Sequence, residues 1–161
     1  MSEFFTKWTR LGISFGVCLG AGGLGSVATR QSLMTWYPQL IKPSFSPPDW
    51  IFAPVWTVLY LMMGYAAYLV WQKKESAPDV LSALLVFGIQ LFLNTSWSFV
   101  FFKFQSLVGG LLVILALWLW IMLTITKFYK ISQTASWLLI PYLLWVSFAS
   151  VLNFALWWLN K

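Results

Sequence analysis

The stretch from residue 90 to residue 101 carries polar and aromatic side chains at a spacing that could build a binding surface. Steps of four, three and four residues separate Gln90, Asn94, Trp97 and Phe101, so a helix would present all four on one face. The amides can form directional hydrogen bonds, and the rings can stack on a flat ligand. An amide in hydrocarbon needs a partner, in a neighbouring helix or in a ligand. Taken alone, this face favours the neighbouring helix.

Two further segments repeat this mixture of aromatic, polar and small side chains at helical spacing. One face consists of Trp56, Tyr60 and Gly64, and the other of Trp145, Ala149 and Asn153. Each is again most simply a contact between helices. The sequence contains no histidine and only one cysteine, which excludes histidine-ligated metal or haem. No acid–base pair or nucleophile accompanies any of the three faces, so binding is better supported than catalysis.

Composition places these faces in a membrane. Of the 161 residues, 60% are hydrophobic and 9% are charged, whereas about a quarter of the residues in a soluble domain are charged. Five apolar segments come close to the ~20 residues that a helix needs to cross a bilayer. These segments cover residues 8–29, 50–71, 80–102, 107–126 and 135–159. The sequence therefore predicts an all-α integral membrane protein, a single five-helix domain over residues 1–161, with a retained first span.

The charged residues lie almost entirely between the spans. All four acidic residues are outside them, and an intramembrane charge would be the usual marker of a proton relay or an ion pathway. A pump or proton-coupled transporter is therefore not expected. The net charge of +6 comes from scattered bases, which favour interfacial anchoring over nucleic-acid binding. Six Lys and Arg residues on the N-terminal side against four opposite indicate a cytoplasmic N-terminus in a bacterial inner membrane.

One connection, residues 30–49, is long enough to have a structure of its own. Alternating spans place it on the same side of the membrane as the ends of the third and fifth helices. At about 1.5 Å per residue, Trp56 lies ~9 Å below that side, Asn94 and Ala149 ~13 Å, and Trp145 ~20 Å. A single pocket with uncharged walls beneath this loop explains the three faces better than three unrelated contacts.

The positions of glycine and proline in the spans predict how the helices pack and where they bend. A ridge of Gly12, Gly16 and Gly20 would let another helix approach closely, and tight packing within the monomer is favoured over a dimer interface. Pro54 and Pro141 lie in the second and fifth spans, where proline predicts bent helices that could enclose a cavity.

Several of these residues belong to longer motifs that resemble the TspO/MBR family, which includes the mitochondrial peripheral benzodiazepine receptor. Trp-Tyr at residues 36–37 and Lys-Pro-Ser-Phe-Ser-Pro-Pro at residues 42–48 are similar to the first-loop pattern WY…KPSWxPP of that family. The motifs PVWTVLY at 54–60, QLFLN at 90–94 and PYLLW at 141–145 are similar to its second, third and fifth helices. The resemblance covers nearly the whole chain, in order.

The resemblance implies a bundle of five transmembrane helices, usually dimeric, with a ligand cavity under the first interhelical loop. Family ligands are porphyrins, haem, isoquinoline carboxamides and benzodiazepines, with sterols in animal members; no cofactor is required. Carried over to this sequence, the ligand-binding residues are Trp36, Tyr37, Pro47, Trp56, Asn94, Trp97, Trp145, Ala149 and Leu152. Trp56 and Trp145 would also be the catalytic pair, if the light-dependent breakdown of protoporphyrin found in some members occurs here.

The sequence departs from the family pattern at two positions. Phe45 replaces the loop tryptophan, which keeps a stacking surface but loses the indole donor. Phe154 replaces the tyrosine of the sterol motif, and Lys161 lies too far along the chain to complete that motif. The second departure argues against sterol as the natural ligand, and the short C-terminus after Trp158 is more typical of bacterial than of animal members.

The leading functional prediction is a membrane receptor or sensor that binds tetrapyrroles, protoporphyrin or haem, in an aromatic cavity. Asn94 would supply a directional hydrogen bond within apolar walls. Arg30 and Lys42 near the mouth could meet propionates, although ordinary interfacial charges are the simpler interpretation. The alternatives are tryptophan-dependent photo-oxidative degradation of protoporphyrin, and translocation of porphyrin or sterol. The expected setting is a homodimer in a bacterial cell membrane, or in the mitochondrial outer membrane of a eukaryote.

Overall fold

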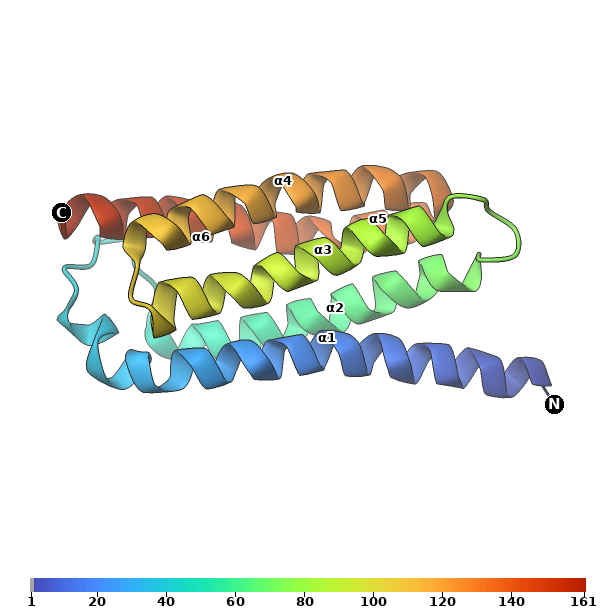
Figure 1. The fold of residues 1–161 in the computed structure, drawn as a ribbon, viewed down its shortest axis with the longest axis horizontal. Helices are drawn as coiled ribbons and strands as arrows, with labels where there is room; N and C mark the ends of the chain where they lie inside the picture. The colour runs from blue at the N-terminus through green and yellow to red at the C-terminus, as the bar shows by residue number, and fades with distance from the viewer. Residues whose placement is uncertain (1) are drawn as a thin grey trace.

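The structure, a computed structural model, describes residues 2–161 as helices that run back and forth along one axis (Figure 1). The helices are α1 (Ser2–Thr35), α2 (Phe52–Gln72), α3 (Val80–Ser98), α4 (Leu107–Ile131), α5 (Gln133–Leu138) and α6 (Ile140–Leu159). Five helical segments are long and apolar enough to cross a membrane, with α5 and α6 together forming the fifth. The predicted all-α membrane architecture is confirmed.

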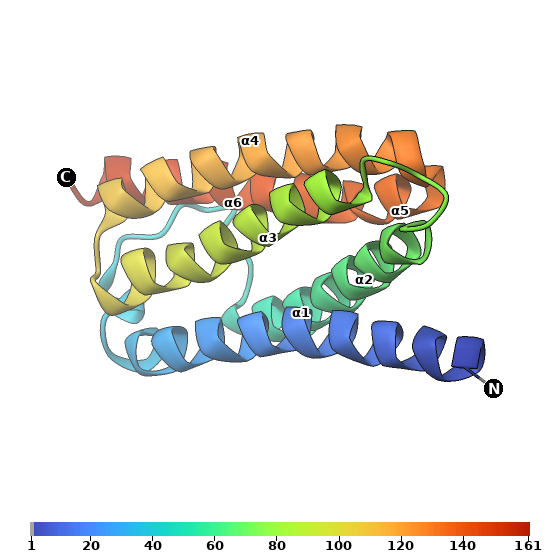
Figure 2. The same ribbon diagram turned by 45° about the vertical axis from the view of Figure 1, so that its right-hand side comes forward.

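The bundle has two distinct ends. The N-terminus, the α2–α3 turn and the α4–α5 junction share one end, while the C-terminus and the long first loop share the other (Figures 1 and 2). Along the chain, α1 packs on α2, α3 on α4, and α4 on both α5 and α6. The loop over residues 36–51 contains two short 3-10 turns, Tyr37–Gln39 and Asp49–Ile51, so it is folded rather than extended.

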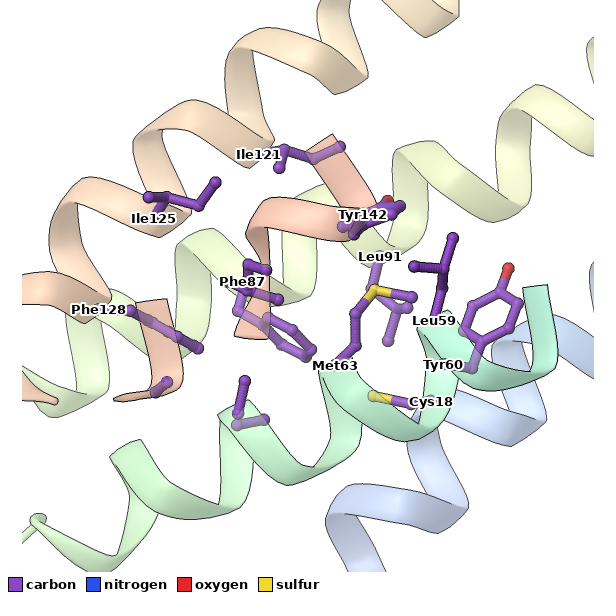
Figure 3. Packing of buried hydrophobic residues seen from close by; sticks show 14 of the residues in the cluster. Cys18, Leu59, Tyr60, Met63, Phe87, Leu91, Ile121, Ile125, Phe128 and Tyr142 are labelled. Atoms are coloured by element: carbon purple, nitrogen blue, oxygen red, sulfur yellow. The ribbon is translucent and has the colours of Figure 1, made fainter. Parts of the chain in front are cut away.

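Apolar side chains from α2, α3, α4 and α6 fill the centre of the bundle (Figure 3). Met63 and Tyr142 are completely buried, and the rings of Phe87 and Phe128 stack with centroids 5.7 Å apart. Gly64 brings two backbones together, because a Cβ at this position would lie 3.2 Å from the Cα of Phe15 on α1. Close backbone approach at a small residue is a usual source of helix association in lipid.

The first helix is longer than its apolar segment predicted. It has 34 residues, or about 51 Å at 1.5 Å per residue, against about 30 Å for the hydrocarbon core of a bilayer. Hydropathy identifies only the part of a helix that is apolar enough to lie in lipid. Once that part is helical, each further residue adds one backbone hydrogen bond, so α1 extends beyond its apolar segment. The second, third and fifth predicted spans begin and end within two residues of the observed helical spans. The fourth helix begins where predicted but continues to Ile131, five residues past the predicted end.

The two prolines behave differently from one another. Pro54 is the third residue of α2, in the first turn, where its missing N–H would have had no helical acceptor. Pro54 therefore does not interrupt α2, which continues unbroken to Gln72. Pro141 follows a break in the fifth span at Leu139, which separates α5 from α6; the sequence predicted a bend in this helix, and the structure has an interruption next to the proline.

A segment of π-helix, Phe99–Lys103, ends the third span and was not predicted. The N–H of Phe104 donates to the carbonyl of Phe99 at 2.9 Å, one residue further back than in an α-helix. Gln105 then adopts a φ of 53° and ends the segment. The wider turn buries both Phe101 and Phe102; such π segments are frequent at functional sites.

The glycine ridge of α1 does not pack within the monomer. A Cβ built on Gly12, Gly16 or Gly20 would meet nothing within 4 Å. The favoured expectation of tight intramolecular packing is wrong at these positions, because α1 turns another face to α2 and α3. The close contacts of α1 are instead at Gly22, which faces the ring of Tyr60, and at Gly25, which faces Ser98.

Candidate ligand cavity

Three sets of contacts fix the loop over residues 36–51: one just before its start, one between its middle and the end of α6, and one within the loop itself. The hydroxyl of Ser32 donates to the carbonyl of Phe102 at 2.6 Å, which fixes the end of α1 to the π segment. The side chain of Asn160 accepts from the N–H of Ile41 at 2.9 Å and donates to its carbonyl at 3.0 Å. Lys42 forms an ion pair with Asp49 at 3.3 Å. These contacts hold the loop across the end of the bundle.

Beneath this loop lies a cavity of about 510 Å³ between α1, α2, α3 and α6. A volume of this size lies within the range of sites that hold drug-sized ligands. Seven of the residues that line it carry aromatic rings: Tyr37, Phe52, Trp56, Tyr60, Trp97, Phe101 and Phe102. The rings of Trp97 and Phe101 stack with centroids 5.2 Å apart. These flat surfaces suit a planar, apolar occupant.

A buried chain of hydrogen bonds lies beside the cavity and continues below it. Tyr60 donates to Oδ1 of Asn94 at 2.5 Å, and Nδ2 of Asn94 donates to the hydroxyl of Tyr142 at 2.8 Å. Tyr142 in turn donates to Oε1 of Gln90 at 2.9 Å. Asn94 is 2% exposed, and both of its polar side-chain atoms have protein partners. The predicted ligand hydrogen bond would therefore use the remaining capacity of Asn94, or that of the Tyr60 hydroxyl.

A second amide braces the opposite wall. The indole N–H of Trp97 donates to Oδ1 of Asn153 at 3.2 Å, and Nδ2 of Asn153 donates to the carbonyl of Leu107 at 2.9 Å. The Trp97 ring is thereby fixed between α3 and α6. The amides of Asn94 and Asn153 both act as helix-to-helix links, as the polar faces of the sequence suggested when each was considered alone.

Two charged residues line the cavity, which corrects the expectation of uncharged walls. They are Arg30, near the end of α1, and Asp49, in the loop. Charge is tolerated there because both residues lie at the loop end of the bundle and are exposed. The deeper walls, at Trp56, Tyr60 and Ala149, are uncharged as predicted.

Tyr37, in the loop, is buried, and its surroundings shift its pKa. The side chain of Tyr37 is 2% exposed, and the Lys42 ammonium lies 4.2 Å from its ring centroid. Burial, followed by the nearby Asp49 carboxylate, raises the pKa of Tyr37 above its ordinary value of 10.0. Tyr37 is therefore a neutral hydrogen-bonding group of the cavity wall at physiological pH.

One side of the cavity is exposed between α1 and α2. Four of the exposed lining residues in this stretch are small, Gly23 and Ser26 on α1 and Ala53 and Thr57 on α2. Leu19, one turn before Gly23, is the large exposed residue beside them. The hydroxyl of Ser26 donates to the carbonyl of Gly23 at 2.7 Å, and that of Thr57 to the carbonyl of Ala53 at 2.9 Å. Both hydroxyls are thus satisfied by their own helices. We call this stretch the side opening; it lies within two membrane-spanning helices.

The structure brings together six of the nine residues expected to bind ligand. Those that line the cavity are Tyr37, Trp56, Asn94, Trp97, Ala149 and Leu152. Trp36 lies behind the wall, with its ring centroid 5.6 Å from that of Phe101. Pro47 is half-buried in the loop and does not line the cavity.

Trp145 is the third expected residue outside the lining. Its ring centroid is 5.8 Å from that of Phe52, and Phe52 does line the cavity. Trp145 is therefore one ring removed, on the far side of Phe52. Its indole N–H is buried and has no hydrogen-bond partner among the described residues.

Apart from Arg30, which was expected near the mouth, the wall contributed by α1 was not predicted from the sequence. It follows one helical face that begins at Leu19 and ends at Leu33 and includes Gly22, Ser26 and Arg30. Steps of three and four residues along this face were the available signal. The ridge of Gly12, Gly16 and Gly20, from which packing of α1 was predicted, lies on a different face of the helix. Phe52 and Phe102 were also missed, because neither stands out in a chain with 14 phenylalanines.

Comparison with known proteins agrees with this architecture. The profile of the TspO/MBR family matches residues 14–159, which include all the helical walls of the cavity. The chain belongs to the TspO/MBR family. It is 47% identical to the tryptophan-rich protein TspO of Chlorobaculum tepidum over 93% of this chain and 95% of that protein.

More distant TspO/MBR relatives extend from bacteria to animals. The tryptophan-rich sensory protein of Cereibacter sphaeroides is 37% identical over 81% of this chain and 82% of its own length. The human translocator protein is 36% identical over 83% of this chain and 80% of its own length. Family membership and the five spans together make this chain a multi-pass membrane protein.

Proposed function

We propose that this protein is a membrane receptor or sensor that binds tetrapyrroles, protoporphyrin or haem, in the cavity under its first loop. The observation that carries the proposal is the combination of a volume of about 510 Å³ with seven aromatic rings in the walls. A planar macrocycle gains apolar burial and ring stacking from such walls. Isoquinoline carboxamides and benzodiazepines, with similar aromatic character, would compete for the same space. No cofactor is needed.

Equilibrium titration of protoporphyrin into the purified protein in nanodiscs tests this proposal. Ala149→Phe places a ring in the cavity wall, where Ala149 is 7% exposed, and should abolish the shift of the porphyrin absorption band. Val151→Phe is the matched control, because it adds the same ring to a 58% exposed position of the same helix. Binding that survives Ala149→Phe unchanged would contradict a site in this cavity.

Light-dependent breakdown of bound protoporphyrin is the alternative with a specific geometric basis. The Trp56 ring lines the cavity, and its centroid lies 5.6 Å from Tyr60 and 6.2 Å from Tyr142, so oxidisable rings continue from the wall into the core. Illumination in air, with the porphyrin spectrum as readout, separates the functions. Loss of bleaching in Trp56→Phe, but not in Trp145→Phe, would favour chemistry at Trp56. Equal bleaching in all variants would leave binding alone.

A second alternative is translocation of porphyrin across the membrane, and we propose that the protein assembles as a homodimer. Porphyrin flux across proteoliposomes, with and without the protein, distinguishes a translocator from a sensor. A homodimer in a bacterial cell membrane is the expected setting, and the exposed ridge of Gly12, Gly16 and Gly20 is the surface we propose for the second copy. Small residues on a lipid-facing helix permit close approach of another helix.

A further inference from the structure

Of the two charged residues that line the cavity at its loop end, Asp49 has an ion-pair partner and Arg30 has none among the described residues. The carboxylate of Asp49 is neutralised by Lys42 at 3.3 Å, and Lys42 also lies over the ring of Tyr37. Arg30 lines the same cavity, but its guanidinium forms no ion pair or hydrogen bond with any residue that the structure describes. Arg30 is thus the cavity-lining group with a free positive charge.

Arg30 occupies a particular place relative to the side opening. It lies four residues after Ser26 on the same face of α1 and five residues before the end of that helix. One helical turn therefore separates Arg30 from the side opening. At 1.5 Å per residue, Arg30 lies about 7.5 Å from the end of the helix. An apolar molecule held in the cavity could keep an acidic edge at this level while the rest of it remains among the rings.

A guanidinium is well suited to bind such an edge. It offers several N–H donors in a planar fork that matches a carboxylate, and hydrogen bonds between charged partners are about twice as strong as neutral ones. Leu33 and Phe52 line the same cavity and supply apolar surface for the rest of the molecule, while the exposed guanidinium binds the acidic edge where water still partly screens the pair.

We propose that Arg30 is a carboxylate-binding residue of the cavity, and that the site selects aromatic, apolar molecules that carry an acidic group at one edge. The proposal deepens the proposed function and rests on it, since it defines which tetrapyrroles the site prefers: free acids over their esters. Arg30 anchors the acid, and the aromatic walls bind the rings.

The test compares protoporphyrin with its dimethyl ester, titrated into wild-type protein in phosphatidylcholine nanodiscs. Wild type should bind the diacid about tenfold more tightly, the equivalent of one charged hydrogen bond. Arg30→Gln should remove this preference by weakening the diacid alone. Lys103→Gln is the control, because Lys103 is a cation at the same end of the bundle that does not line the cavity. It should leave both affinities unchanged.

Two results would overturn the proposal. Arg30→Gln could weaken acid and ester equally, or affect neither; Arg30 would then be an interfacial charge without a role in selection. Pyrenebutyrate and its methyl ester provide a second pair of probes that does not depend on tetrapyrrole binding. If neither porphyrin binds wild type but Arg30 still selects pyrenebutyrate over its ester, the proposed function fails and the anchor stands. If Arg30 makes no difference to this pair either, both fail.

Discussion

Replacing Tyr142 with phenylalanine removes one oxygen atom and tests whether the buried hydrogen-bond chain stabilises the bundle. The hydroxyl accepts from Asn94 at 2.8 Å and donates to Gln90 at 2.9 Å, so its loss leaves two amide groups without these partners. Tyr142 is fully buried, so water does not replace the hydroxyl.

The expected loss can be set from these two bonds. A buried polar group deprived of its partner costs about 1–3 kcal/mol, and hydrogen bonds between membrane helices contribute about 0.6 kcal/mol on average. Two stranded amides would cost about 2–6 kcal/mol on the first scale, and two lost bonds about 1 kcal/mol on the second. We therefore expect Tyr142→Phe to lower the free energy of unfolding by about 2–4 kcal/mol, between these bounds. Tyr60→Phe removes a single bond beside the cavity, where water or a ligand can reach Asn94, and should cost about 1 kcal/mol.

Reversible unfolding in mixed detergent–SDS micelles, followed by circular dichroism, measures these differences. Tyr65→Phe is the control, because Tyr65 is 42% exposed and its hydroxyl has no hydrogen bond to the described part of the chain. It should leave the free energy of unfolding unchanged. If Tyr142→Phe were no more destabilising than Tyr60→Phe, the argument that stranded amides dominate the cost would be refuted.

Three other perturbations follow from the packing of α1, the side opening and the loop. Gly64→Leu should destabilise the fold by about 1–3 kcal/mol, since its Cβ would press on the backbone of α1. Gly16→Leu should preserve the fold, and it should abolish cross-linking between copies if the proposed homodimer forms through the glycine ridge. Ala53→Phe should slow porphyrin association and dissociation in nanodiscs by similar factors, because it narrows the side opening; unchanged rates would rule out access by this route. Burial raises the pKa of Tyr37, so its stabilisation should be complete below about pH 10 and decline above it as the unfolded state ionises first. Alkaline unfolding curves of Tyr37→Phe should accordingly be less steep than those of wild type.

The helices themselves were predictable because the bilayer imposes their length and their apolar character. The polar faces of the second, third and fifth spans were predictable from helical period alone, and Trp56, Asn94 and Ala149 do meet at one cavity. Their shared depth beneath the loop follows from alternating topology and the rise per residue.

The orientation of each helix about its own axis was less predictable. Trp145 shares a helical face with Ala149 by spacing, yet Phe52 separates it from the cavity. The π segment at Phe99–Lys103 arises where the third span meets α1 and the loop, and no local sequence pattern announced the extra residue. In both places the outcome depends on neighbouring helices, which spacing within a single segment does not describe.

The side opening between α1 and α2 affects how the affinity for a ligand should be expressed. Gly23, Ser26, Ala53 and Thr57 are exposed on two helices long and apolar enough to cross a membrane, so we expect the side opening to lie beside acyl chains. The reservoir that supplies an occupant is then the lipid itself, and saturation depends on moles of ligand per mole of phospholipid. Dissociation constants expressed per litre of buffer would vary with the amount of lipid in the assay, even though the contacts inside the protein stay the same.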